Sequence, residues 1–325
     1  MDGIDLSKGK FSCVVCGKRE NGFFIRNKAE YMGQRYVVME CRNCGLGFTD
    51  PKPGKNTLEK LYREYYTEKP CEYNEGIYKH VIKELLYCGS GSSNEFISIL
   101  AEKMIDAMTQ VCPPLVFGTG RILDVGCGFG RLLDLFKLQG WHTFGVEPGI
   151  QASKYARRHG HKIITGEIAD AQFPENYFSC IVFSHSFEHI SDPILALTEA
   201  GRILMRKGMV IIEVPNAACA DSVFYKSAWL GWHLPFHLYH WSKKSLELAI
   251  RNAGFKPIRW KYKLPTTNDI TYNTVNFMKL YRSKPVNYYY TIIKNWVSGH
   301  LGFNKPNYNH FITLYAKKSN NLRDK

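Results

Sequence analysis

Two pairs of cysteines in the first fifty residues have the spacing of a metal site. The pairs occur in CVVCG at 13–17 and in CRNCG at 41–45, and their thiols belong to Cys13, Cys16, Cys41 and Cys44. Two Cys-x-x-Cys-Gly units can place four thiolates around one ion, and a glycine after each pair allows a tight turn beneath it. Four protein ligands leave no open position for a reaction. The spacing therefore predicts a structural zinc site, with iron as the alternative metal.

A second stretch, RILDVGCGFGR at residues 121–131, has the residue types of a loop that binds a ligand. An apolar run predicts a buried strand that ends at Gly126, Gly128 and Gly130, and a helical pattern follows. A glycine turn between a strand and a helix lets backbone N–H groups approach a ligand closely. A tight turn without any ligand is the simpler alternative.

Acidic residues around this loop indicate which ligand it suits. A dinucleotide fingerprint would have its third glycine where Arg131 stands, which disfavours a nicotinamide dehydrogenase. Asp124, two residues before the first glycine, suits a positive charge better than a pyrophosphate. Glu147 ends the next predicted strand, where a carboxylate can accept hydrogen bonds from ribose hydroxyls. Together these residues favour S-adenosylmethionine, which carries a sulfonium and an ammonium group and no phosphate.

Histidine is the side chain best suited to take a proton from an acceptor near neutral pH. Five histidines fall where ligands would enter the predicted sheet: His185, His189, His233, His237 and His240. For His189, bracing of the helix that follows is an alternative role. The spacing of His233, His237 and His240 would also allow a metal site on one helical face, but Pro235 interrupts such a helix.

The elements that position these residues alternate between strand and helix over residues 119–241. Strand-like runs such as RILDVG, HTFGVEP and SCIVFSHS alternate with helical runs such as LLDLFKLQG and IQASKYARRHG. This alternation is typical of a doubly wound parallel sheet, which binds ligands at the carboxyl ends of its strands. FITLYAKK at 311–318 supplies the last of seven strands. We therefore predict an α/β fold with a Rossmann-like, seven-stranded sheet.

Residues 121–216 resemble a class I S-adenosylmethionine-dependent methyltransferase. The resemblance rests on LDVGCGxG, on the acid in GVEP, on Glu188–His189 before Asp192–Pro193, and on the strand GMVIIEVPN. It implies that the chain is a methyltransferase and that S-adenosylmethionine is its cofactor. One departure is Ser179, which stands where the family usually has an aspartate. Because that position starts a strand, cofactor binding is expected to survive the change.

The resemblance also implies which residues bind the cofactor. They are Asp124, Gly126, Cys127, Gly128, Gly130, Glu147, Glu167, Ile168 and Ser184. The glycines would pass beneath the cofactor, with Asp124 towards its methionine part and Glu147 on the ribose. Glu167 and Ile168 would flank the adenine, and Ser184 would border the cofactor at the end of its strand.

The N-terminal part is similar to the branch of these methyltransferases that carries a zinc ribbon. CRNCGLGFTDPKPG before a tyrosine-rich helix carries this likeness, and the branch includes sugar C-methyltransferases and enzymes of cell-envelope and natural-product clusters. HLPFHLYHWS resembles a segment of the branch next to the site of methyl transfer, and the match falls on His237. The resemblance implies that His237 is a base or a substrate ligand, with His189 as the second catalytic candidate. We expect a small or carrier-linked acceptor, such as a sugar or envelope precursor.

Composition divides the chain into parts: a zinc ribbon (1–55), a helical cap (56–118), a methyltransferase domain (119–318) with an aromatic, basic insertion at about 264–308, and a disordered tail (319–325). Residues 242–325 carry 16 Lys and Arg against 3 Asp and Glu, which is +13 of the net +14. Such a segment suits an anionic substrate or a membrane surface with a lipid-linked one.

The basic segment also suggests an RNA methyltransferase or RNA-binding protein as an alternative. Against this, SHSFEH at 184–189 lacks the Asn/Asp-Pro-Pro-aromatic motif that is used on base amines. A protein that binds the cofactor without catalysis is a further alternative. The N-terminus MDGIDLSKGK has no apolar region of a signal peptide, so a cytoplasmic location is expected. The sequence predicts no oligomeric state.

Overall fold

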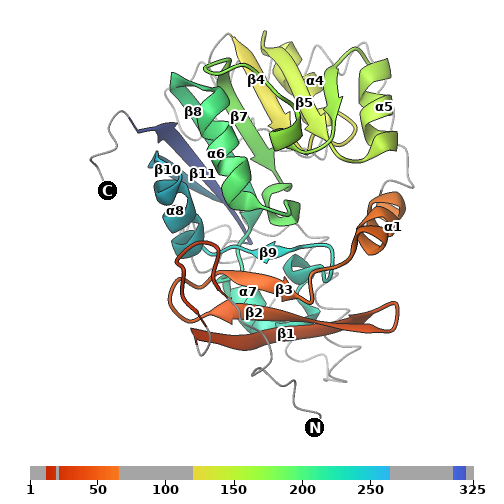
Figure 1. Cartoon of the computed structure of the whole chain (residues 1–325), viewed down its shortest axis with the longest axis vertical. Coiled ribbons are helices and arrows are strands. Elements are labelled where there is room, and N and C mark those ends of the chain that lie inside the picture. The colour runs from red at the N-terminus through yellow and green to blue at the C-terminus, as the bar shows by residue number, and fades with distance from the viewer. Residues whose placement is uncertain (1–11, 20–21, 66–119, 264–309, 320–325) are drawn as a thin grey trace, which may run out of the picture. The chain divides into compact units, whose positions relative to one another are not determined.

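The computed structural model describes four stretches of the chain (Figure 1), namely residues 12–19, 22–65, 120–263 and 310–319. These residues belong to two compact units. The first unit draws on 1–58, 187–198 and 212–325, and the second on 59–186 and 199–211. The cap helices predicted within 66–118 and the insertion predicted at about 264–308 lie outside the described residues.

The larger sheet has seven strands in the order β10-β11-β8-β7-β4-β5-β6, as predicted for a Rossmann-like methyltransferase fold. These strands are β4 (Arg121–Val125), β5 (His142–Glu147), β6 (Lys162–Thr165), β7 (Phe178–Ser184), β8 (Leu204–Pro215), β10 (Phe255–Lys263) and β11 (Phe311–Lys318). Strand β4 pairs in parallel with β5 and β7, and β5 pairs in parallel with β6. Strands β10 and β11 are antiparallel, so the sheet is mixed rather than wholly parallel.

Helices connect the parallel strands as the alternating pattern predicts. They are α4 (Arg131–Leu138), α5 (Ile150–Arg158) and α6 (Pro193–Ile203). The predicted helix over PILALTEAGRILMRKG is too long, because β8 begins at Leu204. The carbonyls of Arg202 and Ile203 accept hydrogen bonds from the N–H groups of Asn176 and Tyr177. These carbonyls therefore bond to the chain before β7 instead of continuing the helix.

The pattern SKKSLELAIRNAGF predicts a helix with Ser242 as its N-cap, and helix α8 (Lys243–Asn252) begins directly after this serine. The Ser242 hydroxyl accepts a hydrogen bond from the N–H of Ser245, and the Ser245 hydroxyl accepts one from the N–H of Ser242. This reciprocal pair satisfies two N–H groups that would otherwise lack helical partners. Gly254 follows the helix with a φ of +82°, a conformation that favours glycine at a helix end.

The smaller sheet is antiparallel, and its strand β2 ends at Cys41, the first residue of the second cysteine pair. Its order is β1-β2-β3-β9, with β1 (Phe23–Tyr31), β2 (Gln34–Cys41), β3 (Gly47–Asp50) and β9 (Tyr239–His240). Strand β9 comes from far along the chain, and it pairs Tyr239 with Phe48 and His240 with Gly47 (Figure 1). The segment around His237 is therefore attached to this sheet.

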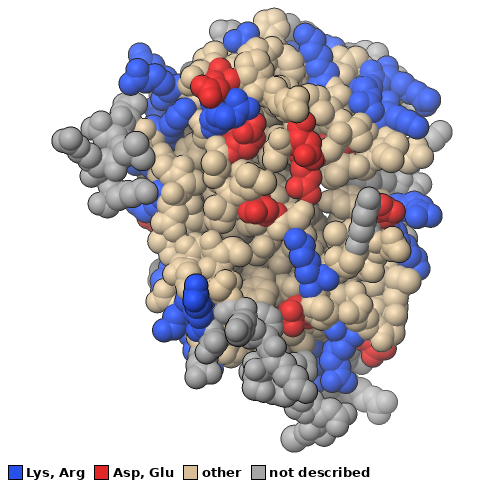
Figure 2. Space-filling view, in the orientation of Figure 1, with Lys and Arg blue, Asp and Glu red and all other residues tan. Residues whose placement is uncertain are grey.

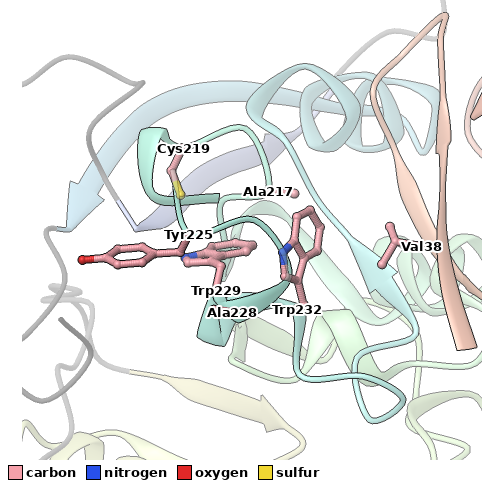
Figure 3. Close-up of a cluster of buried hydrophobic side chains, with 7 residues drawn as sticks. All are labelled: Val38, Ala217, Cys219, Tyr225, Ala228, Trp229 and Trp232. Carbon is pink, nitrogen blue, oxygen red and sulfur yellow. The ribbon is translucent and has the colours of Figure 1, made fainter. Parts of the chain in front are cut away.

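An aromatic cluster holds the chain before this segment. Residues from 217–232 pack together with Val38 of β2 (Figure 3), through α7 (Ala220–Phe224), η5 (Lys226–Ala228) and η6 (Leu230–Trp232). The rings of Trp229 and Trp232 meet edge to face at 5.0 Å. The Trp232 indole donates to the carbonyl of Lys226 at 2.6 Å, so its polar atom is satisfied inside the cluster.

Candidate functional site

The four predicted cysteines lie together. The Sγ atoms of Cys13 and Cys44 are 3.5 Å apart, those of Cys16 and Cys41 are 3.6 Å apart, and all four lie within 4.8 Å of one another. Thiolates bound to one zinc at about 2.3 Å stand about 3.8 Å apart. The hydrogen bond between Cys13 and Cys44 lowers the pKa of Cys13 and raises the pKa of Cys44, so these two thiols share one proton. The set therefore has the size and chemistry of a tetrahedral, structural metal centre.

The two cysteine turns repeat the same backbone geometry. The N–H of Gly17 donates to the carbonyl of Cys13 at 2.9 Å, and the N–H of Gly45 donates to that of Cys41 at 2.8 Å. Both glycines have positive φ, +68° and +74°. In each turn the first cysteine N–H also donates at 2.9 Å to the carbonyl five residues later. The glycine after each pair is thus required by the turn, as the spacing predicts.

The glycine loop connects β4 to α4 and is tightly held. The N–H groups of Gly126 and Cys127 both donate to the carbonyl of Val146 in β5, at 2.7 and 3.1 Å. Gly126 has a φ of +76°, and a Cβ there would lie 2.4 Å from the Cβ of Ser186. Gly130 has a φ of +87° at the start of α4. These positions accept only glycine without rearrangement, and they keep the loop backbone open to a ligand.

Glu147 joins the glycine loop to the next helix. Its side chain is buried, with one carboxylate oxygen accepting from the N–H of Gly128 at 2.8 Å and the other from the N–H of Gly149 at 2.6 Å. Gly149 precedes α5, so the negative charge also stabilises the start of that helix. A carboxylate has about four acceptor positions, so an acidic side chain here suits ribose hydroxyls as well as backbone N–H groups.

Asp124 provides a second buried carboxylate at the loop. Its side chain is 2% exposed, one residue before the carboxyl end of β4. Burial, with a smaller contribution from the charge of Glu147, raises the pKa of Asp124 to about 8. A positively charged ligand would stabilise the ionised form of this pair. The loop therefore fits the ammonium and sulfonium charges of S-adenosylmethionine, which the sequence predicts as the ligand.

The raised pKa of Asp124 predicts how its contribution to stability changes with pH. The unfolded chain releases this proton at about pH 4, whereas the ligand-free folded chain keeps it until about pH 8. Between these values the folded state holds more protons, so this group lowers the free energy of unfolding as pH rises, by at most about 1.4 kcal/mol per unit.

Denaturant unfolding of the native protein and of Asp124→Asn measures this effect. The stability of the native protein relative to Asp124→Asn should fall between pH 5 and pH 8, because asparagine does not titrate. A difference that stays constant over this range would show that Asp124 keeps its ordinary pKa. Unfolding at both pH values in the presence of S-adenosylhomocysteine should show a smaller fall, since the ligand's ammonium favours the ionised carboxylate.

The other predicted cofactor residues occupy the same unit with different exposure. Cys127 is buried in the loop, and burial raises the pKa of its thiol. Ile168 is buried at the start of η3 (Ile168–Asp170), and the exposed Glu167 precedes it. Ser184 is half-buried at the end of β7. Ser186 was not predicted from the sequence: its hydroxyl donates to the carbonyl of Val125, immediately before the glycines.

Both predicted catalytic histidines lie in the first unit, beside an acidic residue. Glu188 and His189 belong to the short helix η4 (Phe187–His189), and His237 precedes β9. One ligand atom from each of these three residues lies within 4.8 Å of the others. Glu188 is buried and entered the sequence analysis only as part of a motif, because nothing local in the chain indicates that it faces His237.

Hydrogen bonds fix the orientation of the two imidazoles. Nδ1 of His189 lies 2.9 Å from the carbonyl of Phe236, and Nδ1 of His237 lies 2.9 Å from the carbonyl of Gly231. A carbonyl can only accept, so each Nδ1 carries the hydrogen and each Nε2 carries the lone pair. Burial lowers the pKa of His237 well below its usual value, which favours the neutral ring.

The alternative of three histidines on one helical face is wrong. His233 ends η6 with a left-handed φ of +35°, and His240 lies in β9, so the residues share no helix. The reason is that the chain turns at Leu234–Pro235 and then pairs with β3. His240 instead lies 3.1 Å from the hydroxyl of Thr49 through its Nε2. That hydroxyl donates to the carbonyl of His237 and holds this backbone in place.

The described surface offers no single basic face in the view of Figure 2. Lysine and arginine side chains are spread over it and are interspersed with acidic and uncharged residues. The basic residues of the predicted insertion lie outside the described part of the chain. Among the described residues, no helix has both the length and the apolar character needed to cross a membrane.

The family model and the similar proteins named below are all described as methyltransferases. A family model described as "Methyltransferase domain" matches residues 96–259, half of the chain. A ubiquinone biosynthesis O-methyltransferase of Alkalilimnicola ehrlichii is 26% identical over 191 residues, which cover 51% of this chain and 74% of that protein. A ubiquinone biosynthesis O-methyltransferase of Azorhizobium caulinodans is 27% identical over 178 residues, which cover 47% of this chain and 69% of that protein. A solved S-adenosylmethionine-dependent methyltransferase of Thermotoga maritima has a TM-score of 0.46 at 15% identity, over 81% and 99% of the two chains.

Proposed function

Since the chain belongs to the methyltransferase-domain family and uses S-adenosylmethionine as its methyl donor, we propose that it methylates a hydroxyl oxygen of a small acceptor. The observation that carries this proposal is the glycine loop with its two buried carboxylates, Asp124 and Glu147. Oxygen is favoured as the acceptor atom because the two relatives named above are O-methyltransferases of ubiquinone biosynthesis.

The proposed acceptor is a sugar or an envelope precursor, free or attached to a carrier. Its support is the likeness of the cysteine turns and of the segment at His237 to the zinc-ribbon branch of the family. We propose that residues 1–55 hold zinc as a ribbon, that 56–118 form a cap, and that 119–318 form the methyltransferase domain. The four clustered thiols support the zinc part of this proposal.

The bound cofactor supplies an electrophilic methyl group on its sulfonium. The protein's part is then to align the acceptor and to exclude water. Asp124 would hold the positively charged methionine part of the cofactor, and Glu147 would hold its ribose. His189 follows the end of β7 by five residues in the chain, and strand ends are where doubly wound sheets bind ligands. We assign His189 and His237 to the binding of the molecule that is methylated. The Nε2 atom of each ring would take a proton from this molecule or bind it as a ligand.

A transfer assay tests this function directly. Protein is incubated with radiolabelled S-adenosylmethionine and, in separate reactions, with catechol-type quinol precursors, nucleotide sugars and structured RNA. We expect label in a small-molecule fraction and an S-adenosylhomocysteine affinity that His237→Ala leaves unchanged while turnover falls at least about 100-fold. Label in RNA, with affinity that falls steeply with salt, would instead establish the nucleic-acid alternative.

A further inference from the structure

We propose that Glu188, His189 and His237 bind a divalent transition-metal ion. Their ligand atoms, one carboxylate oxygen and two imidazole nitrogens, lie within 4.8 Å of one another. Ligand atoms about 2.1 Å from a tetrahedral ion stand about 3.4 Å apart. Two of the three side chains, Glu188 and His237, are buried, so the site is built into the fold.

The hydrogen bonds of the two histidine rings support a metal site. A histidine that ligates a metal usually donates its other ring N–H to a carbonyl or carboxylate, which turns the second nitrogen towards the ion. Both histidines here show this arrangement, with Nδ1 2.9 Å from a backbone carbonyl in each ring. The two rings are also in edge-to-face contact, with their planes inclined at 72° and their centroids 4.8 Å apart, so the imidazoles are direct neighbours in the site.

The backbone around the three residues is held by further contacts within the same unit. The carbonyl of Glu188 accepts from the N–H of Leu238 at 2.8 Å, which ties η4 to the chain beside His237. The hydroxyl of Thr49 donates to the carbonyl of His237 at 2.6 Å. The supporting groups therefore come from β3, η4 and the segment before β9. Support of this kind is what a preorganised metal site needs around its ligands.

The ligand set indicates which ions suit the site. Two imidazoles and one carboxylate favour zinc, iron, cobalt or manganese over magnesium and calcium, which prefer oxygen ligands. Three protein ligands also leave positions open, unlike the four cysteines. An oxygen bound there would become more acidic and would lose its proton to solvent more readily. This activation of the acceptor rests on the proposed function, whereas the binding of the ion does not.

The test measures metal binding without any acceptor. Full-length protein, with its cysteine site first filled with zinc, is titrated with Co²⁺ and followed by calorimetry and visible absorption. We expect one further equivalent of Co²⁺, with ligand-field bands but without the charge-transfer bands that thiolates give. Glu188→Gln and His237→Ala should each weaken this binding by about 100-fold or more. His142→Ala, which removes an exposed imidazole of β5 outside the set, should leave it unchanged.

Several outcomes would overturn the site. No further equivalent of Co²⁺ would show that the three residues form a hydrogen-bonded cluster without metal. An equal loss of Co²⁺ affinity in His142→Ala, or no loss of it in Glu188→Gln, would show adventitious binding to surface histidines. Each variant is also tested for S-adenosylhomocysteine affinity, whose retention shows that it folds. Because the readout needs no methyl transfer, an incorrect acceptor would leave a positive metal result standing.

Discussion

Replacing Gly126 with alanine is expected to weaken binding of S-adenosylhomocysteine by about 100-fold or more. Two costs add at this position. A left-handed φ of +76° costs alanine about 1–2 kcal/mol, and its Cβ would lie 2.4 Å from the Cβ of Ser186. The loop must then move away from the carbonyl of Val146, to which Gly126 and Cys127 donate. Calorimetric titration with S-adenosylhomocysteine measures the loss.

A matched control separates the overlap from the backbone strain. Gly140 has a similar φ of +88°, but no atom lies within 4 Å of the Cβ that alanine would add. Gly140→Ala should therefore lower stability slightly and leave affinity unchanged. Adding Ser186→Gly to Gly126→Ala removes the overlapping atom and should recover part of the binding. Native affinity in Gly126→Ala would mean that this loop does not hold the cofactor.

Replacing Cys41 with serine is expected to remove zinc from the protein and to lower its free energy of unfolding by several kcal/mol. Structural zinc contributes its binding energy to folding, about 10–16 kcal/mol in small zinc domains. Cys41 also ends β2, so loss of the ion reaches the four-stranded sheet. Elemental analysis and thermal unfolding measure both changes. The native protein should carry about one zinc at the four cysteines.

Cys180 provides the matched control for this prediction. It is buried in β7 and lies outside the cluster of four thiols. Cys180→Ala should keep its zinc and lose only the packing of one small side chain. Full zinc content in Cys41→Ser, or a native protein that a chelator strips without any change in melting temperature, would contradict a structural metal.

The parts that sequence predicts best are those whose chemistry is local. The cysteine turns and the glycine loop each need a positive φ, and glycine marks such positions directly in the chain. The N-cap at Ser242 is equally local. The strand alternation also predicts the Rossmann-like sheet, because each strand and helix buries one apolar face.

The parts that sequence misses depend on contacts between distant segments. Nothing in LYHW indicates that Tyr239–His240 pair with β3, and nothing around Glu188 indicates that it meets His237. Alternation in KPIRWKYK predicts that Ile258 faces the core, yet its side chain is 48% exposed. The pairing of β10 with β11 is irregular between Pro257 and Arg259, which shifts the alternation by one residue.

The fourth strand of the smaller sheet, β9, comes far later in the chain than the other three, and this affects biosynthesis. Gly47 pairs with His240, about 190 residues later in the chain, so the sheet stays open while the ribosome makes the intervening chain. Contacts this distant form slowly, and an unpaired strand edge attracts other chains in the meantime. Zinc can reach the cysteines early, but β3 gains its second neighbour, β9, only after His240 has emerged. A nascent chain arrested before that point should therefore aggregate more readily than the finished protein.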